Sequence, residues 1–163
     1  MTIRTADEKD LKAIIDIYNQ AIDEEFCTAD LEYLIPEERL DWFRSHTPEK
    51  YPIFVSEENG TVSGWCSLSA HRPGRGALET TAEISYYIHR DFRKRGIGKK
   101  LITHTIDEAR RLGYQHLFAL LLDMNKASVR ILEKFGFEKW GHLPGIANVR
   151  GTICGQFIYG RKI

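Results

Sequence analysis

A continuous apolar run, from His116 to Leu122, restricts the fold of this chain more than any other feature. Its length suits a β-strand, and an unbroken apolar run is typical of a strand that is buried on both faces. A helical pattern that ends at Gly113 precedes it, and another helical pattern follows from Asn125. A strand between two helices predicts a sheet covered by helices, which is the α/β class.

Periodicity and turn residues predict the other elements. Thr5-Ala-Asp-Glu8 has the form of a helix capping box, and Asn59-Gly60 is a typical two-residue hairpin turn. Pro36 suits the first turn of a helix, and Gly113 suits the position just after one. In chain order we expect helices over 7–25 and from Pro36 through Phe43, strands over 51–56 and 61–70, a loop over 71–78, a strand over 82–88, a helix over 97–112, a strand over 116–122, a helix over 125–135, and closing strands over 137–140 and 156–161. This order predicts one mixed sheet.

The composition favours a single metal-free domain spanning residues 1–163. The 163 residues are 42% hydrophobic and 28% charged, ordinary values for a protein with a real core. Basic and acidic residues balance at 23 each, so we expect no partnership with nucleic acid or with a membrane. Three cysteines without CxxC spacing and six scattered histidines predict neither a disulfide framework nor a zinc site. We interpret the histidines as surface or packing residues and the protein as cytoplasmic.

The segment from Arg93 to Lys100 joins a predicted strand to a predicted helix and carries Gly96 and Gly98. Glycines let backbone N–H groups converge on a phosphate, and the following helix adds its own free N–H groups and positive dipole end. Five basic side chains in eight residues add charge. A pyrophosphate site is one interpretation, and a tight turn with a solvated basic patch is the other. The P-loop pattern is absent, and Leu101 stands where the dinucleotide-binding motif needs its third glycine.

Three motifs in order make the chain resemble the GNAT superfamily of N-acetyltransferases. Arg93-Lys-Arg-Gly96-Ile-Gly98 is similar to its pyrophosphate signature, and Glu83 to His89 is similar to its splayed central strand. Asn125-Lys-Ala-Ser128 through Glu133-Lys-Phe-Gly-Phe137 resembles its downstream helix. The resemblance implies a GNAT fold, in which helices cover both faces of a mixed sheet with a splayed strand pair. It also implies acetyl-CoA as the cosubstrate and direct attack by an amine.

Within the superfamily, the chain most resembles the phosphinothricin and methionine sulfoximine acetyltransferases. The supporting segments are 17–19, 36–43, 81–85 and 140–146. This resemblance implies N-acetylation of a small amino acid or analogue, and a homodimer. A peptide or protein N-acetyltransferase and a weakly catalytic acyl-CoA-binding module remain the alternatives.

The resemblance also assigns site residues for the cosubstrate. The strand edge formed by Tyr86, Tyr87, Ile88 and His89 would pair with the pantetheine arm, and a backbone N–H there would polarise the thioester carbonyl. Asn125 would contact the arm or a bound water, with help from Ser128, although a helix cap is the plain alternative for Asn125. The pyrophosphate would bind at Arg93, Lys94, Arg95, Gly96, Ile97, Gly98 and Lys99.

Glu83 is the candidate general base, because a carboxylate within a sheet is costly unless it has a partner or a task. The alternative is an ion pair with Arg72 or Arg75. The resemblance implies that Arg72 and Arg75 grip a substrate carboxylate, with Glu83 and Ser85 also in the substrate site. A solvated basic loop is the alternative for both arginines. Trp42, Phe43 and Trp65 are expected in the core.

Two positions depart from the family pattern. Leu132 stands where many GNAT enzymes carry a tyrosine general acid and where the phosphinothricin group carries histidine. Gly155 stands where the subgroup often has an aspartate. Leucine cannot donate a proton, but a thiolate is a tolerable leaving group, so we do not expect the first departure to abolish activity.

Overall fold

A computed structural model describes all 163 residues, and its centre is one seven-stranded sheet. The strands lie in the order β1-β2-β3-β4-β5-β7-β6, and β4 with β5 is the parallel pair in an otherwise antiparallel sheet. This confirms the predicted mixed sheet. The strands are β1 (Thr2–Thr5), β2 (Ile53–Glu58), β3 (Thr61–Ala70), β4 (Thr81–Ile88), β5 (His116–Leu122), β6 (Glu138–Val149) and β7 (Thr152–Lys162).

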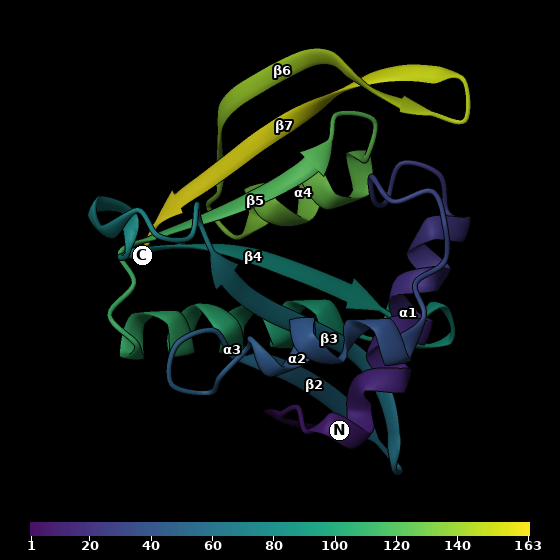
Figure 1. Ribbon diagram of the computed structural model, residues 1–163, viewed down its shortest axis with the longest axis vertical. Coiled ribbons are helices and arrows are strands. Elements are labelled where there is room, and N and C mark those ends of the chain that lie inside the picture. The colour runs from purple at the N-terminus through teal and green to yellow at the C-terminus, as the bar shows by residue number, and fades with distance from the viewer.

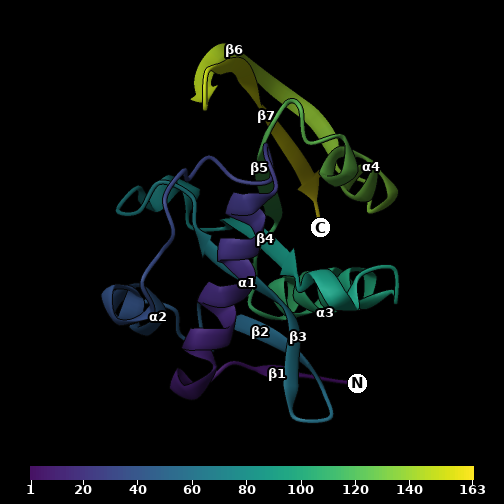
Figure 2. The same ribbon diagram turned by 90° about the vertical axis from the view of Figure 1, so that its right-hand side faces the viewer.

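Four α-helices cover both faces of this sheet, as Figures 1 and 2 show. They are α1 (Leu11–Asp23), α2 (Leu40–Arg44), α3 (Ile97–Arg111) and α4 (Lys126–Lys134). Helices α3 and α4 lie on one side, and α1 and α2 lie on the other. Short 3₁₀ turns precede α1, α2 and α3, at Glu8–Asp10, Pro36–Arg39 and Arg90–Phe92, and a fourth lies at Gly76–Leu78. None of the helices is both long enough and apolar enough to cross a membrane.

Each covered face has its own apolar cluster. The larger cluster lies under α3 and α4 and includes Leu68, Leu101 and Leu117, none of which is exposed. The smaller cluster lies under α1 and includes Ile14, Val55 and Trp65. Burying each such side chain contributes about 1.5–3 kcal/mol, so the two clusters fix the helices against the central strands.

Local signals located several boundaries well. Asn59 and Gly60 both have positive φ, +50° and +78°, as a tight two-residue hairpin turn requires, and β3 begins at Thr61 as predicted. The turn after α3 passes through Gly113 at φ +89°, which confirms its place just beyond that helix.

The N-terminal segment differs from the prediction. Residues 2–5 form the short edge strand β1, and the capping box uses Asp7 and Asp10 rather than Thr5 and Glu8. The Asp7 side chain accepts from the Lys9 N–H at 3.1 Å, and Asp10 accepts from the Asp7 N–H at 2.9 Å. Arg4 donates to Asp10 at 2.6 and 2.9 Å, which ties β1 to this turn. A four-residue edge strand held by such distant contacts has little local pattern to predict it.

The last two strands are also longer than predicted. Strands β6 and β7 form the extended hairpin that projects beyond β5, coloured yellow-green to yellow in Figure 1. Register shifts between Lys139 and Gly141 and between Leu143 and Ala147 interrupt the alternation of β6. Those irregularities conceal a strand from pattern analysis, because each extra residue reverses the faces of the residues that follow.

Strands β4 and β5 separate along their length. Their pairing covers only Thr81–Glu83 against His116–Phe118, and beyond these residues the two strands diverge. In β5, Leu117, Ala119 and Leu121 are buried toward α3 and α4, but Leu120 on the opposite face is 42% exposed. The prediction that this strand is buried on both faces was therefore wrong. Its second face borders the opening that the divergence creates.

Candidate active site

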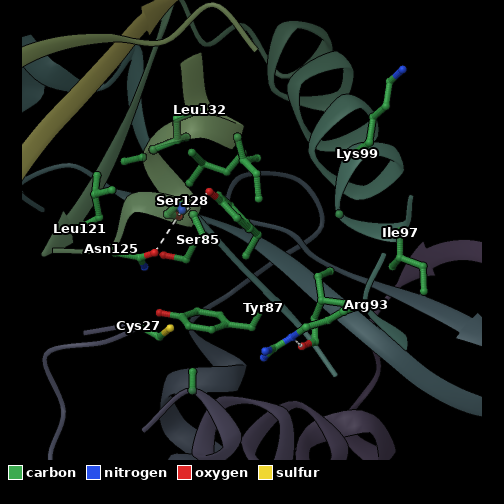
Figure 3. A pocket seen from close by; sticks show the side chains of 18 of the residues that line it. Cys27, Ser85, Tyr87, Arg93, Ile97, Lys99, Leu121, Asn125, Ser128 and Leu132 are labelled. Carbon is green, nitrogen blue, oxygen red and sulfur yellow. Dashed lines mark hydrogen bonds between the residues drawn. The ribbon is translucent and has the colours of Figure 1, made fainter. Parts of the chain in front are cut away.

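The opening between β4 and β5 is a cavity of about 520 Å³ (Figure 3). Its walls are the diverging strands, the turn before α3, and the first turns of α4. It is lined by most of the residues that the family resemblance assigned to the cosubstrate, namely Tyr86, Tyr87, Ile88, Arg93, Lys94, Gly96, Ile97, Gly98, Lys99, Asn125 and Ser128. His89 and Arg95 do not line it.

The turn before α3 presents a row of free backbone donors. No backbone carbonyl accepts a hydrogen bond from the N–H groups of residues 93–99, and the first such bond comes from Lys100 to Gly96 at 3.1 Å. Gly96 caps the helix with φ +78°, a conformation that glycine adopts without steric cost. Free N–H groups at the positive end of a helix form a ready anion site.

Two of the basic side chains of this turn form ion pairs with acidic residues. Arg93 forms an ion pair with Glu24 at 2.6 Å, and Arg95 lies 3.7 Å from Glu58. Lys99 points away from the cavity in Figure 3. The backbone of the turn is therefore the better-defined anion-binding element, and the side chains contribute a more diffuse positive field.

The exposed edge of β4 offers alternate backbone groups to the opening. The His89 N–H donates to Ser63 O of β3 at 3.0 Å, so it faces away from the opening. Because backbone groups alternate along an antiparallel strand, the N–H groups of Tyr86 and Ile88 point toward the side from which β5 has departed. Of the predicted edge residues, these two have backbone donors directed at the cavity.

The N-terminus of α4 closes another wall of the cavity. The Asn125 side chain accepts from the Ser128 N–H at 3.1 Å, so Asn125 is a helix cap that also lines the cavity (Figure 3). The Ser128 and Tyr86 hydroxyls lie 2.6 Å apart. Burial raises the pKa of Tyr86 to about 12, which keeps it protonated at neutral pH. Leu132 also lines this cavity and is only 1% exposed.

A second cavity, of about 350 Å³, lies beside the first. The two share Cys27, Ser85, Tyr87 and Leu120, which form their common boundary. Glu83 lines the second cavity but not the first. Its carboxylate makes no hydrogen bond or ion pair, and burial raises the pKa of Glu83. A half-buried carboxylate without a partner is well suited to accept a proton.

Beside Glu83, on the neighbouring strand β3, lies a serine that contacts a histidine just beyond α2. Ser69 is the register partner of Glu83 on β3, and both line the second cavity. The Ser69 hydroxyl lies 3.2 Å from Nε2 of His46, whose Nδ1 lies 2.8 Å from the Trp42 carbonyl. Burial lowers the pKa of His46, which favours the neutral ring. His46 was predicted, like the other histidines, to be a surface or packing residue. No local pattern predicts its contact with Ser69, because the two residues lie far apart in the chain.

The loop arginines lie apart from this arrangement. Arg72 and Arg75 are exposed, line neither cavity, and form no ion pair with Glu83. Arg39, which sequence analysis did not select, does line the second cavity. Trp42 and Trp65 line it as well as packing against the smaller cluster, so these two core candidates also form a wall of the site.

Comparison with known proteins identifies the family of this fold. The family model described as "Acetyltransferase (GNAT) family" matches residues 11–137. The chain belongs to the GNAT family. Its members named below include acetyltransferases, and this GNAT chain is accordingly an N-acetyltransferase that uses acetyl-CoA.

Relatives and solved structures resemble this GNAT enzyme over nearly its whole length. The Bacillus subtilis protein YwnH, provisionally named a phosphinothricin acetyltransferase, is 41% identical and covers 100% of this chain and 99% of its own. The L-methionine sulfoximine/L-methionine sulfone acetyltransferase of Salmonella typhimurium is 36% identical over 90% of this chain and 85% of its own. A phosphinothricin acetyltransferase from Sinorhizobium meliloti, solved in complex with acetyl-CoA, has a TM-score of 0.92 at 26% identity and covers 99% of this chain and 88% of its own.

Proposed function

We propose that residues 1–163 form a single acetyltransferase domain that acetylates the amine of a small free amino acid or analogue, of the methionine sulfoximine or phosphinothricin kind. The observation that carries this proposal is the pair of adjoining cavities. The turn before α3 lines the first cavity, and an unpartnered carboxylate, Glu83, lines the second. One cavity suits a cosubstrate and the other a small acceptor. The names of the relatives supply the acceptor class.

The first cavity fits acetyl-CoA, which supplies the acetyl group as a thioester. The free N–H groups of residues 93–99 suit a pyrophosphate, with Arg93, Lys94, Arg95 and Lys99 adding positive field. The edge of β4 from Tyr86 to His89 suits an extended pantetheine arm, and the N–H groups of Tyr86 and Ile88 are the donors that face it. Asn125 and Ser128 bound the same space from α4.

Glu83 acts as the general base. The acceptor arrives as an ammonium ion, and the Glu83 carboxylate takes one proton from it, directly or through water, so that the nitrogen lone pair becomes free. That nitrogen then attacks the acetyl carbon at the boundary formed by Ser85 and Tyr87 and forms the C–N bond. The C–S bond breaks as the intermediate collapses, CoA leaves as a thiolate, and the thiolate takes up the proton that the amide nitrogen loses, directly or through water. Burial raises the pKa of Glu83 toward the pH at which the enzyme works, and a general base is most effective when its pKa lies near that pH.

We further propose a cytoplasmic homodimer. The three cysteines form no disulfide, as in a reducing compartment. The β6–β7 hairpin carries the exposed apolar side chains of Leu143, Ile146 and Ile153, an unusual concentration for a free surface. A second copy that covers this hairpin would bury them, and sedimentation of Ile153→Lys would reveal a monomer.

A thiol-release assay tests the function. Wild-type enzyme is given acetyl-CoA with free amino acids, methionine sulfoximine, phosphinothricin and short peptides, and we expect turnover on the free amino acid class. Glu83→Gln should lower kcat by about 10²- to 10⁴-fold while acetyl-CoA affinity is retained. Glu79→Gln, which removes an exposed carboxylate four residues earlier, is the matched control and should leave kcat unchanged.

Two results would contradict the proposal. Unchanged turnover in Glu83→Gln at saturating acceptor would remove Glu83 from the chemistry. Turnover confined to peptides would replace the small-molecule acceptor with a polypeptide one.

A further inference from the structure

The second cavity is lined by more acidic than basic side chains. Three charged residues line it: Asp30, Arg39 and Glu83. The Asp30 carboxylate already accepts a hydrogen bond from the Tyr18 hydroxyl. Glu83 is the proposed base. Arg39 is the one positively charged residue of the three.

Arg39 differs from the other arginines of the chain. Three arginines are half-buried, namely Arg4, Arg39 and Arg161. Arg4 is bound by Asp10 and Glu57, and Arg161 donates to the Phe135 carbonyl. Arg39 makes no hydrogen bond and no ion pair. A partly buried guanidinium normally has a partner. Because Arg39 has none, its five N–H donors are available to a ligand.

The segment that carries Arg39 is held firmly against α1. The Asn19 side chain bonds both backbone groups of Leu34, donating to its carbonyl and accepting from its N–H, each at 2.9 Å. Pro36 then restricts the first residue of the turn that ends at Arg39. Leu34 and Trp42, on either side of this turn, line the same cavity. The backbone that carries Arg39 is therefore held at the edge of this cavity before any acceptor binds.

We infer that Arg39 binds the carboxylate of the amine acceptor and thereby selects free amino acids over uncharged amines. This inference rests on the proposed function, because it concerns the acceptor cavity of that reaction. An amino acid carries an ammonium group and a carboxylate, and the cavity offers Glu83 to the first and Arg39 to the second. The planar guanidinium matches a carboxylate with two parallel hydrogen bonds. The exposed Arg72 and Arg75 lie outside this cavity.

The experiment compares L-methionine sulfone with its carboxamide, which keeps the amine and side chain but lacks the negative charge. Turnover is measured beside equilibrium binding of each acceptor to the enzyme–CoA complex, by titration calorimetry. Wild-type enzyme should prefer the acid. Arg39→Gln should raise KM and Kd for the acid by about 10- to 100-fold and leave the carboxamide almost unaffected. Arg39→Lys keeps the positive charge but cannot form the two parallel hydrogen bonds of a guanidinium. Its KM and Kd for the acid should therefore lie between those of wild type and Arg39→Gln.

Arg44→Gln, which removes an exposed arginine of α2 that lines neither cavity, is the matched control, and circular dichroism with thermal unfolding verifies that each variant is folded. Arg72→Gln and Arg75→Gln test the competing carboxylate site that the family resemblance implies. An unchanged acid-to-carboxamide ratio in Arg39→Gln would overturn the inference, as would loss of that preference in Arg72→Gln or Arg75→Gln. Absence of binding by the acid to wild-type enzyme would overturn it too. Binding that depends on Arg39 without turnover would support Arg39 while contradicting the proposed acetylation.

Discussion

Gly155 is expected to be irreplaceable because two side chains occupy the space beside it. A Cβ at this position would lie 2.5 Å from Oδ2 of Asp123, 2.5 Å from Nε2 of His142, and 2.8 Å from the Leu143 carbonyl oxygen. Asp123 and His142 are themselves hydrogen-bonded at 3.0 Å. Gly155→Ala would therefore force this pair apart and push the backbone of β6 away from β7.

The cost has two parts. The Asp123 and His142 side chains are 22% and 40% exposed, so losing their hydrogen bond costs only about 0.5–1 kcal/mol. The overlap with a backbone carbonyl cannot be relieved by a side-chain rotation, and overpacking of this kind costs about 1–3 kcal/mol. The sum is roughly 1.5–4 kcal/mol, which for a chain of this size corresponds to a fall in Tm of about 3–16 °C, at about 2–4 °C per kcal/mol.

Urea and thermal unfolding of four proteins provide the assay: wild type, Gly155→Ala, Asp123→Ala and the double variant. Truncating Asp123 empties part of the space, so the alanine at 155 should cost about 1 kcal/mol less in that background. Gly76→Ala is the control, because nothing lies within 4 Å of a Cβ there. A stability of Gly155→Ala within about 0.5 kcal/mol of wild type, or strict additivity with Asp123→Ala, would refute the reasoning.

Three further predictions concern titratable groups. Arg4 and the Asp7 N–H hold the pKa of Asp10 below its ordinary value despite burial. The ionised Asp10 therefore stabilises the fold at pH values above its ordinary pKa, and this stability is lost as the pH falls through its lowered pKa. Asp10→Asn should make the free energy of unfolding depend less on pH in the acid range. Burial raises the pKa of Glu83, so activity should rise as the pH passes through this raised pKa. Above it, the buried charged carboxylate lowers the stability of the fold. Glu83→Gln should therefore unfold at or above the wild-type temperature at neutral pH. Cys27 is the half-buried thiol of the three and borders both cavities, so peptide mass mapping should find it alkylated first, and acetyl-CoA should slow that reaction.

Much of the fold was predictable because its signals are local. The strand His116–Leu122, the hairpin turn Asn59-Gly60 and the end of α3 at Gly113 each depend on a few adjacent residues. The phosphate-type turn before α3 belongs with them, since its glycines and the helix that follows are consecutive in sequence. Strand β1 and the full length of β6 and β7 depend on partners elsewhere in the chain, and their own residues carry a weak pattern.

The candidate site divides in the same way. The sequence by itself determined most of one wall of the first cavity, because residues 86–99 form a strand, a turn and a helix start in one continuous segment. Only the tertiary structure decided the wall of the second cavity, where Arg39, Glu83 and Ser69 come from three separate elements. It also explained Gly155, whose space is filled by the distant Asp123 carboxylate. Backbone conformation follows largely from neighbouring residues, whereas the meeting of side chains across a sheet follows from packing, which no single segment records.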